Sequence, residues 1–306
     1  METPVRRVVE GTVDVPDGAV WFQRHDADGP GIPLLCLHGG PGMPHDYLEP
    51  LAELVDQRPV IFYDQLGCGR SATHGSKPQW TVDRFLDELE VVRSSLGLTD
   101  VVIFGNSWGG MLAMRYMLGS PGGVAGLVLS SAPASVSRWV ADAQRLRADL
   151  PEAVQTVLAV HEQAGFYSCP EYQGAVAEFY RRHLCRLEPW PECVERTFAG
   201  LGSEVYSQMW GPSEFGPVTG ALQDWEVLDQ VPKIVVPTLV TCGRFDEATP
   251  EHMADLARAL PHAELAIFEL SSHMAFLEEQ HTYLDRLRDF LGDVDRRRAE
   301  HASPRG

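Results

Sequence analysis

Short runs of consecutive apolar residues recur along the chain, and each is followed by a polar or glycine-rich loop. The runs cover residues 34–37, 60–63, 101–104, 127–129, 238–241 and 265–268. Uninterrupted apolar runs of this length are typical of parallel strands that are buried on both faces. Amphipathic stretches between most of them, such as 82–96 and 252–260, indicate helices. The alternation predicts an α/β fold with a mostly parallel, doubly wound sheet, whose active-site loops follow the carboxyl ends of the strands.

Two segments depart from this alternation. Residues 8–15 and 19–24 flank Pro-Asp-Gly at 16–18 and predict an N-terminal hairpin. Residues 134–231 contain no convincing buried strand; they carry amphipathic patterns interrupted by prolines. We therefore expect a core built from residues 1–133 and 232–306, with a helical cap at 134–231 that is inserted between two core strands and lies over the carboxyl edge of the sheet.

Composition narrows the classes of partner. Of the 306 residues, 44% are hydrophobic and 22% are charged, which is ordinary for a soluble globular protein. Acidic residues outnumber lysine and arginine by 43 to 25, for a formal charge of −18. This excess disfavours nucleic acid and anionic membranes as partners and suits a small neutral or cationic substrate. The arginines at 296–298 lie in a polar tail that we expect to be solvated and frayed.

The cysteines and the N-terminal residues indicate the cellular compartment of the protein. The six cysteines are scattered, without a C-x-x-C pair, and Cys36 and Cys242 fall inside apolar runs as small buried side chains. Residues 1–7 lack the apolar segment of a signal peptide, and no run reaches the length of a membrane span. The simplest interpretation is a reduced, cytoplasmic protein.

Ser107 is the strongest candidate for chemistry. It lies in Gly-Asn-Ser-Trp-Gly at 105–109, a G-x-S-x-G motif between the apolar run 101–104 and a helix-like stretch at 111–118. Strand, tight turn and helix form the context in which this motif becomes a nucleophile elbow, because a strained serine on a sharp turn needs neighbours without Cβ. The alternative is an ordinary glycine-rich turn between a strand and a helix.

A serine nucleophile needs a base, and the base needs an orienting carboxylate. Asp246 follows the run 238–241, and His273 follows the run 265–268, in the chain order Ser, Asp, His that this motif requires. We expect both side chains to reach Ser107. The alternatives are that Asp246 only caps the helix near residue 249 and that His273 is a loop histidine without a special role.

The segment His-Gly-Gly-Pro-Gly at 38–42 directly follows the strand at 34–37. A loop in this position supplies the second N–H of an oxyanion hole, so the expected donors are the backbone N–H groups of Gly40 and Trp108. The alternative is a glycine-rich turn that serves only the path of the backbone. No metal-binding pattern is present, and we expect neither a metal nor a cofactor.

Three blocks together carry a family resemblance: HGGPG at 38–42, DQLGCGRS at 64–71 and GNSWGG at 105–110. The chain resembles the proline iminopeptidase (prolyl aminopeptidase) family of α/β-hydrolases. Within that family it is most similar to tricorn-interacting aminopeptidases and L-amino acid amidases, on the strength of MWGPSEF at 209–215 and GRFDEATP at 243–250. The resemblance covers all but the C-terminal tail and implies an α/β-hydrolase fold with a cap.

The resemblance also implies acidic side chains that receive a free α-ammonium group. The matching positions are Glu214, in the cap, and Glu247, next to Asp246. The alternatives are a solvated loop acid for Glu214 and a charge in the first turn of a helix for Glu247. We expect the aromatic residues Trp108, Tyr206, Trp210 and Phe215 to contribute to the pocket.

The resulting hypothesis is a serine aminopeptidase or amino acid amidase. It releases N-terminal residues, proline among them, through an acyl-enzyme, from small peptides or amides with a free amino terminus. One alternative is an esterase or a tailoring hydrolase of peptide-like metabolites; a more distant one is a ligand-binding homologue without catalysis.

Overall fold

The computed structural model describes residues 7–27, 29–75, 78–213 and 218–302. Within them, nine strands form one sheet in the order β1-β2-β4-β3-β6-β7-β8-β9, with β5 paired to β2. The strands are β1 (Val8–Val15), β2 (Gly18–His25), β3 (Leu34–Leu37), β4 (Val60–Tyr63), β5 (Ala72–Thr73), β6 (Val101–Asn106), β7 (Val124–Ser130), β8 (Thr238–Gly243) and β9 (Ala263–Phe268). β1 and β2 form the predicted antiparallel hairpin, and β3, β4 and β6–β9 pair in parallel. The α/β-hydrolase architecture is confirmed.

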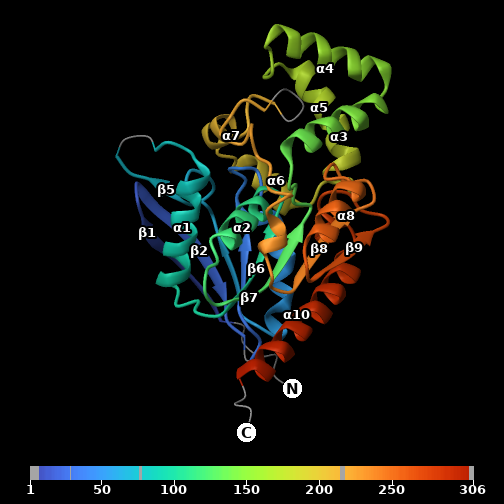
Figure 1. Cartoon of the computed structure of the whole chain (residues 1–306). Helices are drawn as coiled ribbons and strands as arrows, with labels where there is room; N and C mark the ends of the chain where they lie inside the picture. Colours follow the sequence, from blue (N-terminus) through green and yellow to red (C-terminus); the bar gives the residue numbers. More distant parts are fainter. Residues whose placement is uncertain (1–6, 28, 76–77, 214–217, 303–306) are drawn as a thin grey trace.

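The central strands are buried on both faces, and alternate residues feed two different cores. In β6, Val101 and Ile103 join a core that includes residues of α1 (Val82–Ser95), α2 (Trp108–Leu118) and α8 (Pro250–Ala259). The intervening Val102 and Phe104 join a second core with the 3₁₀ helix η1 (His45–Asp56), α9 (Ala275–Glu278) and α10 (Gln280–Ala302). Successive side chains of a strand point to opposite faces of the sheet, and each face is covered by a layer of helices (Figure 1).

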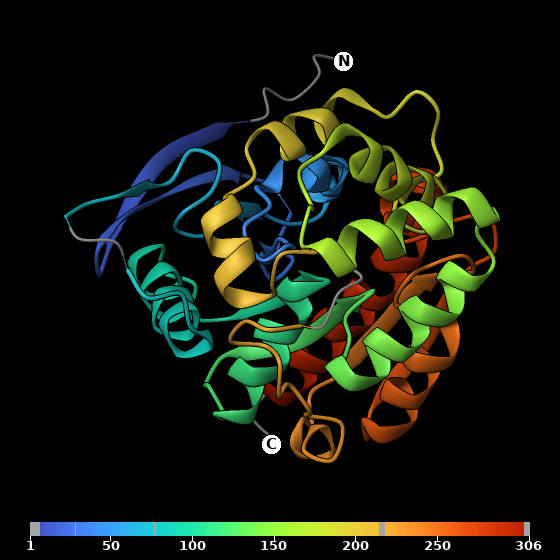
Figure 2. The ribbon, with the colours of Figure 1, turned by 90° about the horizontal axis from the view of Figure 1, so that it is seen from above.

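Helices occupy the long connection between β7 and β8. They are α3 (Val136–Ala148), α4 (Glu152–Ala164), α5 (Pro170–His183), α6 (Glu192–Ala199) and α7 (Ser203–Met209), and the short 3₁₀ helix η2 (Val231–Lys233) precedes β8. Figures 1 and 2 show them gathered at one end of the sheet, opposite the two chain termini. α4 and α5 also enclose a small apolar core of their own, which includes Leu158, Tyr172 and Phe179.

Polar contacts hold these helices to the rest of the chain. Arg138 of α3 donates to Asp255 of α8 at 2.8 Å. Arg196 of α6 donates to Asp46 at 3.0 Å and to Glu49 at 2.6 Å, both in η1. Because these side chains are partly solvated, each pair contributes modestly to stability, and their effect is to fix the position of the helices.

Two elements differ from the prediction. The arginines at 296–298 are part of α10, which remains helical to Ala302, so the expectation of a frayed segment there is wrong. Asp295, on the same helix, pairs with the buried Arg58 at 2.8 Å and ties the C-terminal helix to the loop before β4. The segment 45–56, for which no element was predicted, forms η1, with Pro50 inside it.

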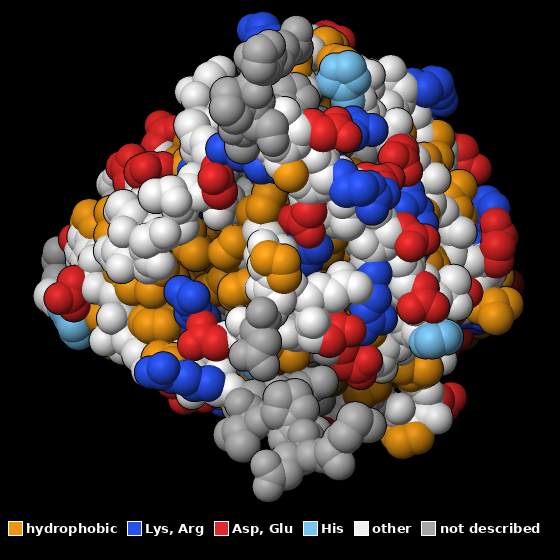
Figure 3. Space-filling model, turned by 90° about the horizontal axis from the view of Figure 1, so that it is seen from below, with side chains coloured by type: hydrophobic (Ala, Val, Ile, Leu, Met, Phe, Trp, Pro, Cys, Tyr) orange, Lys and Arg blue, Asp and Glu red, His pale blue; other side chains and the backbone are white. Residues whose placement is uncertain are grey.

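The face opposite the helical end carries acidic and basic side chains intermixed, with apolar atoms between them (Figure 3). None of the helices described is long and apolar enough to cross a membrane.

Candidate active site

Ser107 lies at the turn between β6 and α2. Its backbone has φ 52° and ψ −120°, a strained conformation that L-residues rarely adopt. The flanking glycines are required by close approach: a Cβ on Gly109 would lie 2.1 Å from the carbonyl oxygen of Leu37, and one on Gly105 2.5 Å from that of Gly109. The G-x-S-x-G segment therefore has the geometry of a nucleophile elbow, with Ser107 directly before the first turn of α2.

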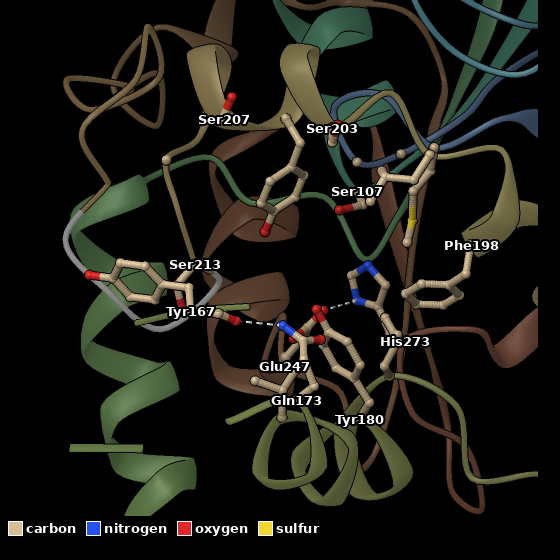
Figure 4. A pocket seen from close by; sticks show the side chains of 18 of the residues that line it. Ser107, Tyr167, Gln173, Tyr180, Phe198, Ser203, Ser207, Ser213, Glu247 and His273 are labelled. Carbon is tan, nitrogen blue, oxygen red and sulfur yellow. Dashed lines mark hydrogen bonds and ion pairs between the residues drawn. The ribbon is translucent and has the colours of Figure 1, made fainter. Parts of the chain in front are cut away.

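His273 and Asp246 meet at the same end of the sheet, in the loops after β9 and β8. The Nδ1 atom of His273 lies 2.7 Å from Oδ1 of Asp246. Both side chains are buried, and His273 and Ser107 line one cavity. Figure 4 shows the imidazole of His273 and the hydroxyl of Ser107 facing the same space. Asp246 does not cap α8, because the side chain of Thr249 does so.

Asp246 accepts hydrogen bonds from several donors besides His273. The backbone N–H of Ala248 donates to Oδ1 at 2.8 Å, and the hydroxyl of Ser131 donates to Oδ2 at 2.6 Å. Ser131 directly follows β7 and has φ 54°, a second strained non-glycine backbone at this edge. Charge-assisted hydrogen bonds of this kind fix the orientation of a buried carboxylate. Ser131 was not predicted from the sequence, because no motif marks it.

The loop after β3 brings Gly40 to the cavity beside Ser107. Gly40 has φ 110°, and a Cβ there would lie 2.6 Å from the backbone nitrogens of Gly42 and Met43, so only glycine fits. The N–H of Gly39 already donates to the hydroxyl of Tyr47 at 2.7 Å. Within the described residues, the backbone N–H groups of Gly40 and Trp108 have no hydrogen-bond partner, which leaves both available to an oxyanion.

Gln65 joins the Gly40 loop to the serine turn. Its Nε2 donates to the carbonyl oxygen of His38 at 3.1 Å, while its Oε1 accepts from the indole Nε1 of Trp108 at 2.8 Å. Its backbone N–H donates to Nε2 of His38 at 2.8 Å. Burial lowers the pKa of His38 to about 4, so this imidazole is neutral and acts as a structural acceptor.

A cavity of about 400 Å³ lies above Ser107, between the sheet edge and the helices of the β7–β8 connection. Its wall is rich in aromatic and hydroxyl side chains (Figure 4). The aromatic members are Tyr47, Tyr167, Tyr172, Tyr180, Phe198 and Tyr206. Tyr206 was expected in the wall, whereas Trp108 and Trp210 belong to the core below it and Phe215 lies outside the described residues. The aromatic residues of α5 were missed, because a helical aromatic pattern is equally typical of core packing.

Glu247 reaches the cavity from the loop after β8. The residue is 3% exposed, and its Oε1 lies 3.8 Å from Nδ1 of His273 (Figure 4). It precedes α8, whose first-turn acid is Glu251. Glu247 is therefore not a charge of the first helical turn. Glu214, the other acid expected at the ammonium, lies outside the described residues.

The C-terminal end of α5 contacts both loops that carry the site. The carbonyl oxygen of His183 accepts from the backbone N–H of His273 at 3.2 Å and from that of Glu247 at 3.4 Å. The carbonyl oxygen of Leu184 accepts from Met274 at 3.2 Å. The position of α5 is thus coupled to that of His273.

One cluster of the described residues has the donor atoms for a metal: His45, Asp46 and Glu49, with ligand atoms within 4.8 Å of one another. Arg196 already pairs with both carboxylates, and His45 Nδ1 lies 2.8 Å from Asp64. We therefore interpret the cluster as part of an ion-pair network rather than as a metal site.

Comparison with known proteins gives the family. A family model described as the alpha/beta hydrolase fold matches residues 32–280. The proline iminopeptidase of Heyndrickxia coagulans is 41% identical over 93% of this chain and 99% of its own length.

Solved structures agree with these sequence comparisons. The crystal structure of a proline iminopeptidase from Mycobacterium smegmatis has a TM-score of 0.86 at 38% identity, over 94% of this chain and 99% of the other. That of VinJ has a TM-score of 0.89 at 40% identity, with the same coverage of 94% and 99%.

Proposed function

This chain belongs to the proline iminopeptidase family of α/β-hydrolases, and on that premise we propose that it is a serine aminopeptidase. It releases N-terminal residues, proline among them, from small peptides or amino acid amides through an acyl-enzyme. The observation that carries this proposal is the buried His273–Asp246 pair on the same cavity as Ser107, with Glu247 beside it.

In the proposed mechanism, Ser107 attacks the carbonyl carbon of the first residue while His273 accepts the hydroxyl proton. Asp246 accepts from Nδ1 of His273, which leaves Nε2 free for the proton and stabilises the imidazolium. The developing oxyanion accepts from the N–H groups of Gly40 and Trp108. Each such donor lowers the barrier by about 3–4 kcal/mol.

The imidazolium of His273 then protonates the leaving nitrogen, and the C–N bond breaks. Water, deprotonated by the same imidazole, attacks the ester carbonyl on Ser107 and releases the free amino acid. The proton returns to Ser107 Oγ, so the chain ends the cycle as it began.

Glu247 gives the enzyme its selectivity for a chain end. An exopeptidase must recognise the terminal α-ammonium group, and a buried carboxylate on the cavity wall is its natural partner. Removing one member of a desolvated charge pair costs about 2–5 kcal/mol, or roughly 30-fold to several thousand-fold in rate. Glu214 completes the ammonium site in this proposal.

The proposed substrate is therefore a small molecule with a free amino terminus.

The six cysteines are all free in the described structure, which suits the cytoplasmic location that we propose.

The test compares prolyl arylamide, its N-acetyl derivative and a prolyl ester on the purified protein. We expect Ser107→Ala to lower turnover of all of them on the order of 10⁶-fold. Glu247→Gln should lower kcat/KM for the free-amine arylamide by about 30-fold or more and leave the N-acetyl substrate little changed.

Glu251→Gln is the matched control, because Glu251 is an exposed acid in the first turn of α8, outside the cavity. It should change neither substrate. Equal hydrolysis of blocked and free-amine substrates by the unmodified protein would refute recognition of the ammonium group. It would favour the esterase alternative instead.

A further inference from the structure

Glu278, the last residue of α9, binds the loop that carries His273. Its Oε2 accepts from the backbone N–H of Ser272 at 2.7 Å, and its Oε1 accepts from the hydroxyl of the same serine at 2.9 Å. Burial raises the pKa of the Glu278 carboxyl, because the group is partly removed from water. Hydrogen bonds to a shielded carboxylate are stronger than the same bonds in water. The residue directly before His273 is therefore held firmly from the side of α9.

The same carboxylate also binds the segment that follows α5. Its Oε1 accepts from the backbone N–H of Arg186 at 2.6 Å, a contact between residues 92 positions apart in the chain. α5 itself forms part of the cavity wall, through residues that include Tyr172 and Tyr180. Glu278 therefore joins an element of the substrate cavity to the loop that carries His273.

The next residue, Glu279, binds the same loop without this second attachment. Its Oε2 accepts from the backbone N–H of Leu270 at 2.9 Å and from the hydroxyl of Ser271 at 2.6 Å. Within the part of the chain that the structure describes, the hydrogen bonds of this carboxylate stay inside the loop. The two glutamates are thus a matched pair, which differ in the link to α5.

From these contacts, and resting on the proposed function, we infer that Glu278 is a positioning residue for His273. It holds the loop of the base in register with α5, so that the imidazole is aligned with Ser107 and with a substrate that lies against α5. The backbone bonds from His273 and Met274 to the end of α5 join the same two segments, and Glu278 adds a third attachment, at the preceding residue. A misplacement of about 1 Å at the reacting groups costs on the order of a hundredfold in rate, so the alignment matters for the chemical step.

The experiment compares Glu278→Gln with Glu279→Gln in steady-state hydrolysis of prolyl arylamide. A glutamine side chain has one acceptor oxygen, and its NH₂ group cannot accept a hydrogen bond. Glu278→Gln therefore loses the bond from the N–H of Ser272 or the bond from the N–H of Arg186. We expect its kcat to fall by about tenfold to a hundredfold with little change in KM. Glu279→Gln, which leaves the link to α5 intact, should lower kcat much less.

The reaction of Ser107 with a fluorophosphonate gives a second measurement that does not depend on the choice of substrate. His273 activates the serine in this reaction too, so the labelling rate should fall in Glu278→Gln and stay near normal in Glu279→Gln. If the unmodified protein does not hydrolyse prolyl arylamide, the proposed function fails, and the labelling rates still test the role of Glu278.

Amide hydrogen exchange tests the cause. We expect faster exchange in the segments around Arg186 and Ser272 in Glu278→Gln, because its carboxylate binds an N–H group in each. In Glu279→Gln the exchange should become faster around Leu270 and stay unchanged around Arg186. Unchanged exchange around both Arg186 and Ser272 in Glu278→Gln would contradict the link.

Two kinetic results would overturn the inference. The first is a folded Glu278→Gln protein with normal kcat and a normal labelling rate. The second is an equal loss in Glu278→Gln and Glu279→Gln, because it would assign the effect to the loop alone. Glu278→Asp replaces the glutamine variant if that protein does not fold. It keeps the charge but is one methylene too short to reach both partners, so its kcat should fall with KM little changed, and a normal kcat would refute the role.

Discussion

At the scale of single residues, the alignment of the proposed oxyanion donors depends on Gln65. Its side chain bonds both the loop that carries Gly40, through His38, and the turn that carries Ser107, through Trp108. We predict that Gln65→Met lowers kcat by about tenfold to a hundredfold with little change in KM. Small displacements of a donor are felt in the transition state more than in binding. Steady-state kinetics with prolyl arylamide measure the effect.

Trp108→Phe provides the comparison, because it removes the indole donor and keeps the backbone N–H. The double variant Gln65→Met with Trp108→Phe should lose little more activity than the stronger single variant, since both break the same contact. A Gln65→Met protein with lower thermal stability but normal kcat would show that Gln65 only supports the fold.

The residue scale also shows what a sequence can and cannot predict about a site. Ser107 is marked by its local motif, and Asp246 and His273 by their positions after consecutive strands. Ser131 and Gln65 act through contacts between segments far apart in the chain, at 115 residues for Ser131 to Asp246 and 43 for Gln65 to Trp108. Contacts between segments so far apart in the sequence can be identified only from the folded structure.

At the scale of elements, α1 carries a buried acid that links stability to pH. Glu88 is fully buried and accepts from the backbone N–H of Leu66 at 3.2 Å. Burial raises its pKa from 4.5 to about 8. Between these values the folded chain keeps a proton that the unfolded chain has released. Stability therefore falls as pH rises through this window, by up to about 1.4 kcal/mol per pH unit.

We predict that Glu88→Gln reduces this dependence, because glutamine keeps an acceptor for Leu66 and does not ionise. Its free energy of unfolding relative to the unmodified protein should increase steadily from pH 5 to pH 8, as measured by urea denaturation. The exposed neighbour Asp87 provides the control variant Asp87→Asn, which should not change the slope. Parallel pH curves for Glu88→Gln and the unmodified protein would contradict the prediction.

The loss of stability at acidic pH has a different origin, in buried histidines. Burial lowers the pKa of His38 and of His252 from 6.5 to about 4. Between these values the unfolded chain binds protons that the folded chain does not, so stability is lost as pH falls from 6.5 towards 4.

Helices and strands were predicted correctly where the hydrophobic pattern of the sequence matches the burial of the side chains in the fold. The doubly buried strands and the amphipathic helices α1 and α8 have a clear period, and their positions were predicted to within a few residues. η1 contains Pro50 and a 3₁₀ geometry that gives no regular helical pattern. α10 ends in a charged turn whose stability depends on packing, including the pair between Asp295 and Arg58, so composition alone suggested fraying.

At the scale of the whole molecule, the formal charge of −18 affects the rate at which charged substrates associate with the protein. A cationic substrate is attracted to an acidic protein, and salt screens that attraction. We predict that kcat/KM for prolyl arylamide falls several-fold between about 0.01 M and 0.5 M ionic strength. N-acetylprolyl arylamide, which is neutral, should vary much less. A parallel salt dependence for both substrates would assign the effect to the folded protein rather than to attraction of the substrate.

The central claim is that Ser107 is the nucleophile, made reactive by His273 beneath the helices that cover it. Labelling with a fluorophosphonate, followed by peptide mass spectrometry, tests it most directly. We predict one adduct on the peptide that contains Ser107, slowed by a prolyl substrate, much slower in His273→Ala and absent in Ser107→Ala. Hydrolysis of prolyl arylamide that persists after complete modification of Ser107, or an adduct on another residue that abolishes it, would contradict the account.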